Sequence, residues 1–283
     1  MARPARRLLR ASVYVMAMAF TASAQPTLSG AVNAASYMPP GMPSSAIAQG
    51  SVFSVFGGNL GPASYTVASS FPLPTNLAGT TLSVTVKGVT KPTILLSAGP
   101  NQINAILPSD VPMGTGTLTA AVNGQTSTAL QIQVTAAAFG IFTFASSGIG
   151  QAVVTDPSYV PNSVIHPFHP GDVAILWGTG LGPISGSDAG LPPTGNLPGD
   201  IQVIVGNSQA KVTYHGRSGC CAGVDQIVFT VPPGVDGCAV PVSVQANGQT
   251  SNFPTIAVSS GGGTCSDSPL GSALLEKLAS ARM

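Results

Sequence analysis

Charged residues are scarce in this sequence: they make up 7% of its 283 residues, against about 25% in an average soluble domain. Long surface helices usually carry Glu and Lys, so the scarcity of these two residue types favours strands and turns. The only glutamate is Glu276, so the paired carboxylates of a glycosidase would have to be aspartates alone. The sequence also contains neither a G-x-S-x-G elbow nor an H-E-x-x-H motif. These absences predict that the protein is not an enzyme.

Histidine is equally scarce, with three in the chain. His166 and His169 lie in a proline-stiffened loop close to Asp172 and could supply two ligands to a zinc or copper ion. Such a site needs about four ligands in a defined geometry. We therefore expect an exposed loop here, with no metal site and no cofactor.

Much of the positive charge lies at the N-terminus, in four arginines: Arg3, Arg6, Arg7 and Arg10. The apolar run 11–20 and an Ala22-Ser23-Ala24 cleavage motif follow, which predicts a secretory signal peptide at residues 1–24. An uncleaved anchor is the alternative, although the run is short for a bilayer-spanning helix. Cleavage leaves a net charge of 6 − 9 = −3, so we expect no nucleic-acid partner. No later stretch has the pattern of a transmembrane segment, so we expect no membrane span after cleavage. The predicted location is secreted, periplasmic or at the cell surface.

A six-residue stretch occurs twice, as Gly57–Pro62 and again as Gly178–Pro183, an offset of 178 − 57 = 121 residues. Asn123-Gly124-Gln125-Thr126-Ser127 recurs letter for letter from Asn247, and Gln102-Ile103 recurs at Gln226, with offsets of 247 − 123 = 124 and 226 − 102 = 124. Regular offsets of this kind indicate that one domain has been used twice.

Each repeat contains about seven short runs of alternating apolar and polar residues separated by turns, which is typical of an immunoglobulin-like sandwich. An up-and-down barrel is the alternative. The sequence therefore predicts an all-β protein of two tandem immunoglobulin-like sandwiches, at residues 25–138 and 139–260. Residues 261–283 are predicted to be a Gly-rich spacer and a short C-terminal helical tail.

The repeated turns are rich in glycine but lack the Lys-Ser/Thr of a phosphate loop. Glycine permits positive φ and close approach of neighbouring backbone. Four residues are accordingly predicted to hold the structural turns: Gly57, Gly61, Gly178 and Gly182.

All four cysteines lie in the second repeat, and export makes them potential disulfides. Following the predicted strands up and down the sandwich places Cys238 and Cys265 at the same end and Cys220 and Cys221 at the other. A strand of six residues is about 20 Å long, whereas a disulfide needs Cα atoms within about 7 Å. We therefore expect a Cys238–Cys265 bridge and a vicinal Cys220–Cys221 bridge. Two free thiols at Cys220 and Cys221 are the alternative.

The chain resembles the IPT/TIG type of immunoglobulin-like domain, and more closely an uncharacterised secreted C-terminal domain family of acidobacteria. The resemblance covers about residues 29–265 and is carried by these stretches: Val32–Tyr37, Pro72–Gly79, Gln102–Ala105 and Gly219–Gly223. It implies a paired sandwich on an exported protein and supplies no catalytic residue.

These features predict a non-catalytic exported β-sandwich module for adhesion, surface display or assembly, with a carbohydrate-binding module as the alternative. Its partner would be a protein or glycan at the cell exterior. The candidate partner-contact loop runs from Arg217 to Val224, includes Cys220 and Cys221, and lies close to Tyr214. A rigid loop without a ligand is the alternative. The single tryptophan, Trp177, is expected in the core rather than on a sugar-binding surface.

Overall fold

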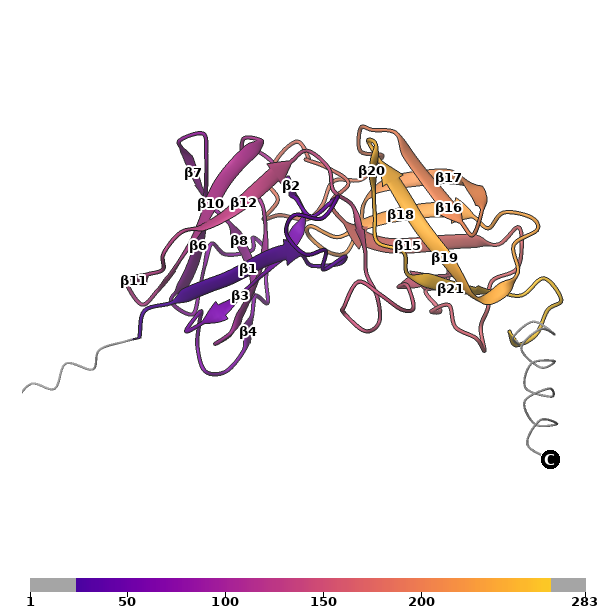
Figure 1. Ribbon diagram of the computed structural model, residues 1–283, viewed down its shortest axis with the longest axis horizontal. Helices are drawn as coiled ribbons and strands as arrows, with labels where there is room; N and C mark the ends of the chain where they lie inside the picture. Colours follow the sequence, from indigo (N-terminus) through magenta and orange to yellow (C-terminus); the bar gives the residue numbers. More distant parts are fainter. Residues whose placement is uncertain (1–23, 266–283) are drawn as a thin grey trace, which may run out of the picture.

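The computed structural model describes residues 24–265, which form two β-sandwiches placed end to end (Figure 1). No helix occurs in this range, and none there could cross a membrane. The predicted all-β, tandem-sandwich fold is confirmed. Residues 1–23 of the predicted signal peptide and the predicted tail helix lie outside the described residues.

The first sandwich has two sheets with the strand orders β1-β3-β9-β8-β4 and β2-β12-β10-β6-β5, and β7 and β11 extend the second of them. Its strands are β1 (Thr27–Asn33), β2 (Ile47–Ala48), β3 (Val52–Gly58), β4 (Thr66–Val67), β5 (Asn76–Leu77), β6 (Thr80–Val86), β7 (Val89–Pro92), β8 (Ile94–Ala98), β9 (Gln102–Ile106), β10 (Gly114–Val122), β11 (Gln125–Thr126) and β12 (Leu130–Thr135).

Alternation along these strands builds the first core. In β6, Leu82, Val84 and Val86 are fully buried while the residues between them are partly exposed. Phe53 and Val55 of β3 face them from the other sheet in the same apolar cluster. Each such side chain stabilises the fold by about 1.5–3 kcal/mol when fully buried.

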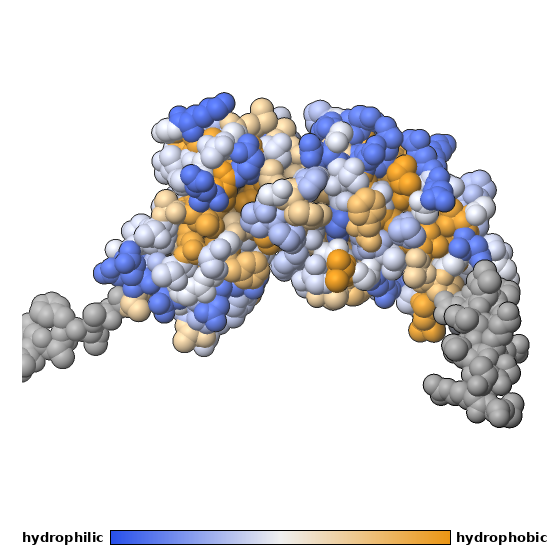
Figure 2. Space-filling model, viewed as in Figure 1, coloured by the Kyte–Doolittle hydropathy of each residue, from blue (hydrophilic) through white to orange (hydrophobic). Residues whose placement is uncertain are grey.

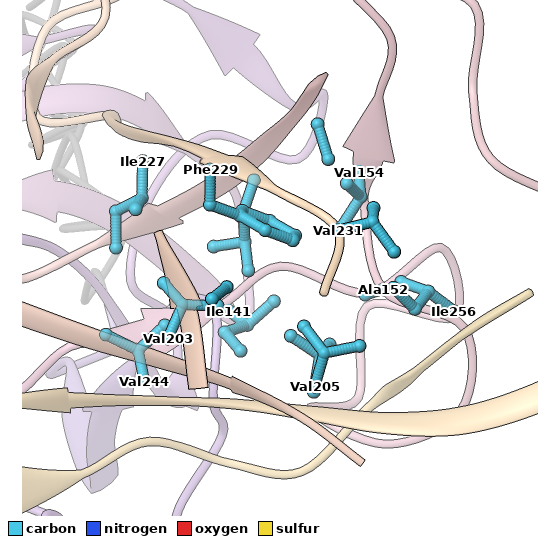
Figure 3. Packing of buried hydrophobic residues seen from close by; sticks show 14 of the residues in the cluster. Ile141, Ala152, Val154, Val203, Val205, Ile227, Phe229, Val231, Val244 and Ile256 are labelled. Carbon is cyan, nitrogen blue, oxygen red and sulfur yellow. The ribbon is translucent and has the colours of Figure 1, made fainter. Parts of the chain in front are cut away.

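The second sandwich is a single nine-stranded sheet. Seven strands follow the order β13-β15-β18-β17-β16-β19-β20, and the other two, β14 and β21, pair with β15 and β19. β17 pairs with β16 through its first residues and with β18 through its last, so the sheet folds over on itself around the core. Figure 3 shows this core between β16, β18 and β19. The strands are β13 (Gly140–Ile141), β14 (Val154–Thr155), β15 (Val173–Thr179), β16 (Ile201–Val205), β17 (Ser208–Arg217), β18 (Asp225–Thr230), β19 (Gly237–Ala246), β20 (Gln249–Thr250) and β21 (Thr255–Val258).

Equivalent strands of the two repeats have equivalent neighbours. β3 pairs with β9 as β15 pairs with β18, and β6 pairs with β10 as β16 pairs with β19. The repeated Asn123-Gly124 and Asn247-Gly248 pairs all have positive φ at the β10–β11 and β19–β20 turns, as a type I′ hairpin requires. The boundary between residues 138 and 139 stays a prediction.

The repeated glycine-rich turns differ in one respect from the expectation. Positive φ occurs at Asn59 (55°) and Gly180 (106°), the third residue of each turn, and also at Gly182 (141°). Gly57, Gly61 and Gly178 have no positive φ, so of the two reasons given for glycine only close approach applies to them.

Close approach is the constraint at those three glycines. A Cβ at Gly57 would overlap the carbonyl oxygen of Thr27, and one at Gly178 would overlap the ring of Phe139. At Gly61 the nearest atom would be the carbonyl oxygen of Gly99, at 3.0 Å. Gly57 and Gly178 are the next-to-last residues of β3 and β15, where β1 and β13 pair closely with them, so they lack a side chain for steric reasons.

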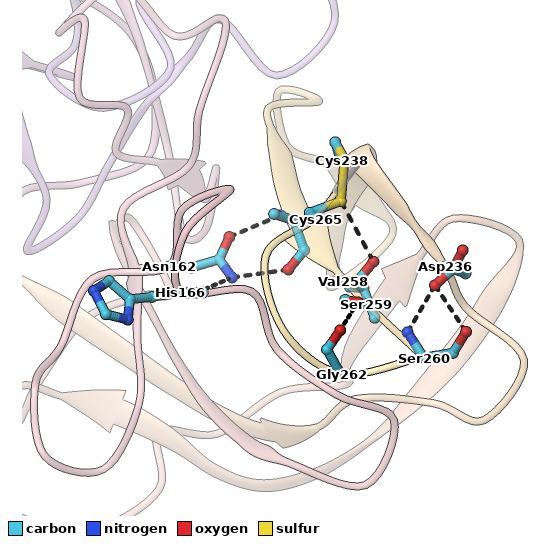
Figure 4. The surroundings of a disulfide bond; sticks show 10 residues. Asn162, His166, Asp236, Cys238, Val258, Ser259, Ser260, Gly262 and Cys265 are labelled. Atoms are coloured by element: carbon cyan, nitrogen blue, oxygen red, sulfur yellow. Dashed lines mark hydrogen bonds between the residues drawn. A yellow bond between two sulfur atoms is a disulfide. The ribbon is translucent and has the colours of Figure 1, made fainter. Parts of the chain in front are cut away.

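Both predicted cysteine pairs lie at disulfide-bonding positions. The Cα atoms are 5.5 Å apart for Cys238–Cys265 and 3.8 Å apart for Cys220–Cys221. Figure 4 shows the first bridge beside Asp236, whose carboxylate accepts hydrogen bonds from the backbone N–H and hydroxyl of Ser260. The bridge and these hydrogen bonds fasten the segment after β21 to the start of β19.

Candidate functional site

A buried arginine links the two sandwiches. Arg217, the last residue of β17, is 2% exposed and forms an ion pair with Asp225 at the start of β18. Its Nη2 donates hydrogen bonds to the carbonyl oxygens of Gly182, at 2.8 Å, and of Gly50 in the first sandwich, at 3.0 Å. The Arg217 guanidinium therefore joins β18 and the glycine-rich turn of the second sandwich to the first sandwich.

Asp225 in turn fixes the glycine-rich turn of the second repeat. Its Oδ2 accepts hydrogen bonds from the backbone N–H of Gly180, at 2.7 Å, and of Leu181, at 2.8 Å. Burial raises the pKa of this carboxyl, while Arg217 and the two N–H groups oppose the rise. Removal of either partner would leave a buried charge without its counter-charge, which is strongly destabilising.

A second chain of hydrogen bonds crosses the junction beside this ion pair. The backbone N–H of Val52 donates to the hydroxyl of Thr179 at 2.8 Å, and that hydroxyl donates to the carbonyl oxygen of Gly223 at 2.6 Å. Val52 and Ile106 of the first sandwich also pack against Ala222 of the second. Polar and apolar contacts thus hold the sandwiches together.

Asp188 makes a third connection. Its carboxylate accepts hydrogen bonds from the backbone N–H of Ser109, at 2.7 Å, and from the Ser109 hydroxyl, at 2.8 Å. Burial raises the pKa of Asp188, and the two hydrogen bonds from Ser109 oppose that rise. This contact lies close to Gly50, because the Gly50 N–H donates to the carbonyl oxygen of Leu107, which is two residues before Ser109.

The predicted partner-contact loop therefore has a different role along most of its length. Arg217 is buried in the junction and cannot touch an external partner, so that part of the prediction is wrong. The Tyr214 hydroxyl donates to the Arg217 carbonyl oxygen at 2.6 Å, so it holds the backbone of the residue whose side chain forms the junction. Cys220 and Cys221 are exposed at the loop tip, and their contact with a partner stays a prediction.

A cleft of about 370 Å³ opens beside the junction and takes its walls from both sandwiches. The first sandwich supplies most of the lining, and Phe142, Thr143, Ser146 and Val224 supply the rest. Its first-sandwich lining comprises Ala34, Ala35, Tyr37, Val52, Ser54, Tyr65, Val67, Leu96, Ser97 and Asn104. No sequence pattern had singled out this set, because its members come from distant segments.

Four polar side chains that the first sandwich contributes to the cleft form one connected network. The Tyr65 hydroxyl lies 2.9 Å from the Ser97 hydroxyl and accepts a hydrogen bond from Asn104 Nδ2 at 3.0 Å. The Ser54 hydroxyl donates to Asn104 Oδ1 at 2.8 Å. Aromatic rings and fixed, uncharged hydrogen-bonding groups side by side suit a neutral ligand that has both polar and apolar faces.

Trp177 also differs from its expected position. It lies on β15 between buried neighbours, is itself only partly buried, and points away from the core that contains Leu176. Its indole N–H donates to the Thr155 hydroxyl at 3.2 Å. The expectation of a core tryptophan is wrong, because Trp177 lies on the face of β15 opposite the core residues Ala174 and Leu176, where the ring of Tyr159 packs beside it.

The histidine loop holds no metal-binding cluster. His169 contacts Asp172 through its backbone N–H, at 2.8 Å, and through Nδ1, at 3.2 Å. Within residues 24–265, no three His, Cys, Asp or Glu side chains are grouped closely enough to hold a metal ion.

On the face in Figure 2, apolar residues form small separate areas on both sandwiches, so no large apolar surface marks a docking site on that face.

No family model matches the chain, and no curated protein matches it significantly. Among solved structures, it is similar to SGBP-B of the mixed-linkage glucan utilization locus of Bacteroides ovatus, in complex with a mixed-linkage heptasaccharide (TM-score 0.35, 16% identity, 76% of this chain and 42% of that chain). It is also similar to SGBP-B from a complex xyloglucan utilization locus in Bacteroides uniformis (0.27, 13%, 83% and 50%) and to domains 5–6 of the S-layer protein SbsC (0.25, 13%, 84% and 100%). The chain spans half or less of the first two structures. At these TM-scores the similarities carry no functional argument.

Proposed function

We propose that the mature protein is an exported, non-catalytic β-sandwich module that binds a partner at the cell exterior, for adhesion, surface display or assembly. The observation that carries this proposal is the junction around Arg217. A buried ion pair bonded to both sandwiches holds them in a fixed relative orientation, and a fixed pair of sandwiches presents its cleft and loops preorganised for binding.

The cysteines support an exported location. Disulfides persist in oxidising compartments and are rare in the cytosol, and this chain has both of its cysteine pairs at bonding positions. The signal-peptide pattern of residues 1–24 gives the same location. Both features support a secreted, periplasmic or surface-associated location.

The composition of the cleft supports a binding role over a catalytic one. A hydrolase needs a nucleophile activated by a neighbouring base. The hydroxyls of Ser54, Tyr65 and Ser97 are connected instead to the neutral amide of Asn104 or to one another.

A carbohydrate-binding module is the second candidate, and the same cleft favours it. Sugars present hydroxyl groups at their edges and C–H groups on their faces, so they pair with amides, hydroxyls and aromatic rings together. The cleft offers Tyr37, Tyr65 and Phe142 beside Asn104 and three serines.

The general proposal is tested by binding to intact cells. Fluorescently labelled protein, lacking residues 1–24, is titrated onto cells of the source organism, with an excess of unlabelled protein as competitor. Saturable binding that the competitor displaces is expected. Uptake that rises linearly with concentration, unaffected by competitor, would overturn the proposal.

A further inference from the structure

Each sandwich carries a tyrosine packed on a strand aromatic at the equivalent position. The ring centroids of Tyr37 and Phe56 are 6.5 Å apart, and those of Tyr159 and Trp177 are 6.1 Å apart. Both pairs are tilted, at 38° and 45°. The tyrosines are offset by 159 − 37 = 122 residues and the strand aromatics by 177 − 56 = 121, which are the offsets of the repeat.

The two tyrosines also share an uncommon backbone conformation. Tyr37 has φ of 51° and Tyr159 has φ of 64°, in the left-handed region that bulky residues seldom occupy. Both follow a serine, Ser36 and Ser158. Strained backbone of this kind gathers at ligand-binding positions, and here it occurs twice at the same point of the fold.

A glutamine completes each group from the next strand. Gln102 of β9 lies opposite Phe56 of β3, and Gln226 of β18 lies opposite Trp177 of β15. Directly opposite residues of an antiparallel pair project from the same face of a sheet. Because the adjacent Val55 and Leu176 are buried in the cores, each aromatic–glutamine pair faces outward.

Tyr159 is far more exposed than a residue packed in the core. Its side chain is 63% exposed, although its ring lies beside the largest aromatic of the chain. Asp156 is the nearest charged residue in the sequence. Its Oδ1 accepts hydrogen bonds from the backbone N–H of Ser158, at 2.8 Å, and of Val160, at 2.9 Å. Tyr37, its counterpart, lines the cleft between the sandwiches.

We propose that these two groups are equivalent sugar-binding platforms, which engage a single neutral polysaccharide chain. The first platform is Tyr37, Phe56 and Gln102, and the second is Tyr159, Trp177 and Gln226. The inference rests on the proposed exterior binding function and names its partner. Each tyrosine ring stacks on the C–H face of one sugar unit, and each glutamine amide oxygen accepts hydrogen bonds from its hydroxyls, since Gln102 Nε2 already donates to Asn104 Oδ1 at 2.9 Å.

Duplication at a fixed separation is what favours a polymer over a free sugar. A repeating chain offers the same unit twice, and the Arg217 junction holds the two platforms in one relative orientation. Once the first platform is occupied, the second meets its unit at a high effective concentration, which raises the overall affinity by roughly 10²–10⁴-fold. A neutral chain fits because all six platform side chains are uncharged.

The experiment combines affinity electrophoresis with tryptophan fluorescence. The mature protein is run through gels containing a soluble β-glucan, a galactomannan or amylose, with hyaluronate as the anionic comparison. Tyr37→Asn and Tyr159→Asn remove each ring while keeping a residue that tolerates positive φ. Tyr37→Phe and Tyr159→Phe keep the rings, and Phe253→Ala removes an aromatic that is 64% exposed outside both platforms.

At least one neutral polysaccharide is expected to retard the wild type. Each Tyr→Asn variant should bind it roughly 10²-fold more weakly, the double variant should not bind, and the Phe and Phe253→Ala variants should match the wild type. The chain has one tryptophan, so ligand at the second platform should shift its emission in Tyr37→Asn but not in Tyr159→Asn.

No retardation by any neutral polysaccharide, retardation by hyaluronate alone, or binding that both Tyr→Asn variants retain would overturn the inference. Unfolding curves of the variants separate loss of binding from loss of fold. If the polysaccharides fail while competed, saturable binding to cells persists, the exterior binding function stands and its partner is a different class of molecule.

Discussion

The Nη2 atom of Arg217 donates a hydrogen bond to the carbonyl oxygen of Gly50, at 3.0 Å and across 167 residues of sequence. Because of this contact, the end of β17 belongs to the junction between the sandwiches and not to an exposed loop. The same ion pair also fixes the glycine-rich turn after β15, because Asp225 accepts from Gly180 N–H and Arg217 donates to the Gly182 carbonyl oxygen.

Substitution of Arg217 by Ala is expected to lower the free energy of unfolding by about 3–5 kcal/mol, because Asp225 would remain buried without its counter-charge. Urea denaturation followed by tryptophan fluorescence and circular dichroism measures the effect. The two signals should separate if the second sandwich unfolds first.

Lys211→Ala is the matched control, because this exposed cation lies on the same strand. It should change stability by no more than about 0.5 kcal/mol. Equal stability of the Arg217→Ala and Lys211→Ala variants would show that the ion pair does not hold the junction.

Gly178→Ala is expected to cost about 1–3 kcal/mol, because the added Cβ would overlap the ring of Phe139 and the carbonyl oxygen of Gly140. Gly219→Ala is the control, since a Cβ there meets nothing within 4 Å. Thermal unfolding of the two variants and the wild type gives the comparison. A Gly178→Ala variant as stable as Gly219→Ala would contradict the steric argument.

The repeat, the strands and both cysteine pairs could be predicted from the sequence because they depend on local patterns. Alternation marks strands such as β6, and Asn-Gly marks the hairpins at Asn123 and Asn247. The direction of successive strands was then enough to bring Cys238 and Cys265 to the same end.

The junction could not be predicted, because burial of Arg217 depends on the first sandwich, which lies far away in sequence. A lone arginine beside two cysteines is indistinguishable in sequence from an exposed loop residue. The ring pairs had a usable signal, since Ser36-Tyr37 and Ser158-Tyr159 share the repeat offset. That signal is only two letters long, and the left-handed backbone that sets it apart is visible only in the structure.

Replacement of Cys238 and Cys265 together by Ser is expected to lower the free energy of unfolding by about 2–4 kcal/mol, because the bridge closes a segment with a sequence separation of 27. Replacement of Cys220 and Cys221 should have little effect, within about 0.5 kcal/mol, since adjacent residues enclose almost no chain. Thiol counting on the unreduced, denatured protein should find no free thiol. Two free thiols would reject the vicinal bridge.

The stability contributed by Asp188 should increase as the pH falls from 7 to 4. Burial raises the pKa of this carboxyl in the folded protein above its unfolded value, so the folded state takes up the proton more readily than the unfolded state. The contribution is therefore complete below the unfolded pKa, about 3.9, and is lost as the pH rises through the folded pKa. Asp188→Asn removes this titration, so the wild type should gain stability relative to the variant as the pH is lowered, in urea titrations at pH 7, 5.5 and 4.

Asp236→Asn is the control with the opposite sign. Hydrogen bonds from the Ser260 backbone N–H and hydroxyl lower the pKa of Asp236, so its contribution is present above the unfolded pKa and is lost as the pH falls through the folded pKa. Relative to Asp236→Asn, the wild type should therefore lose stability toward low pH. Two differences of the same sign would mean that the Asp188 carboxylate is hydrated rather than buried against Ser109, and the third connection between the sandwiches would have to be discarded.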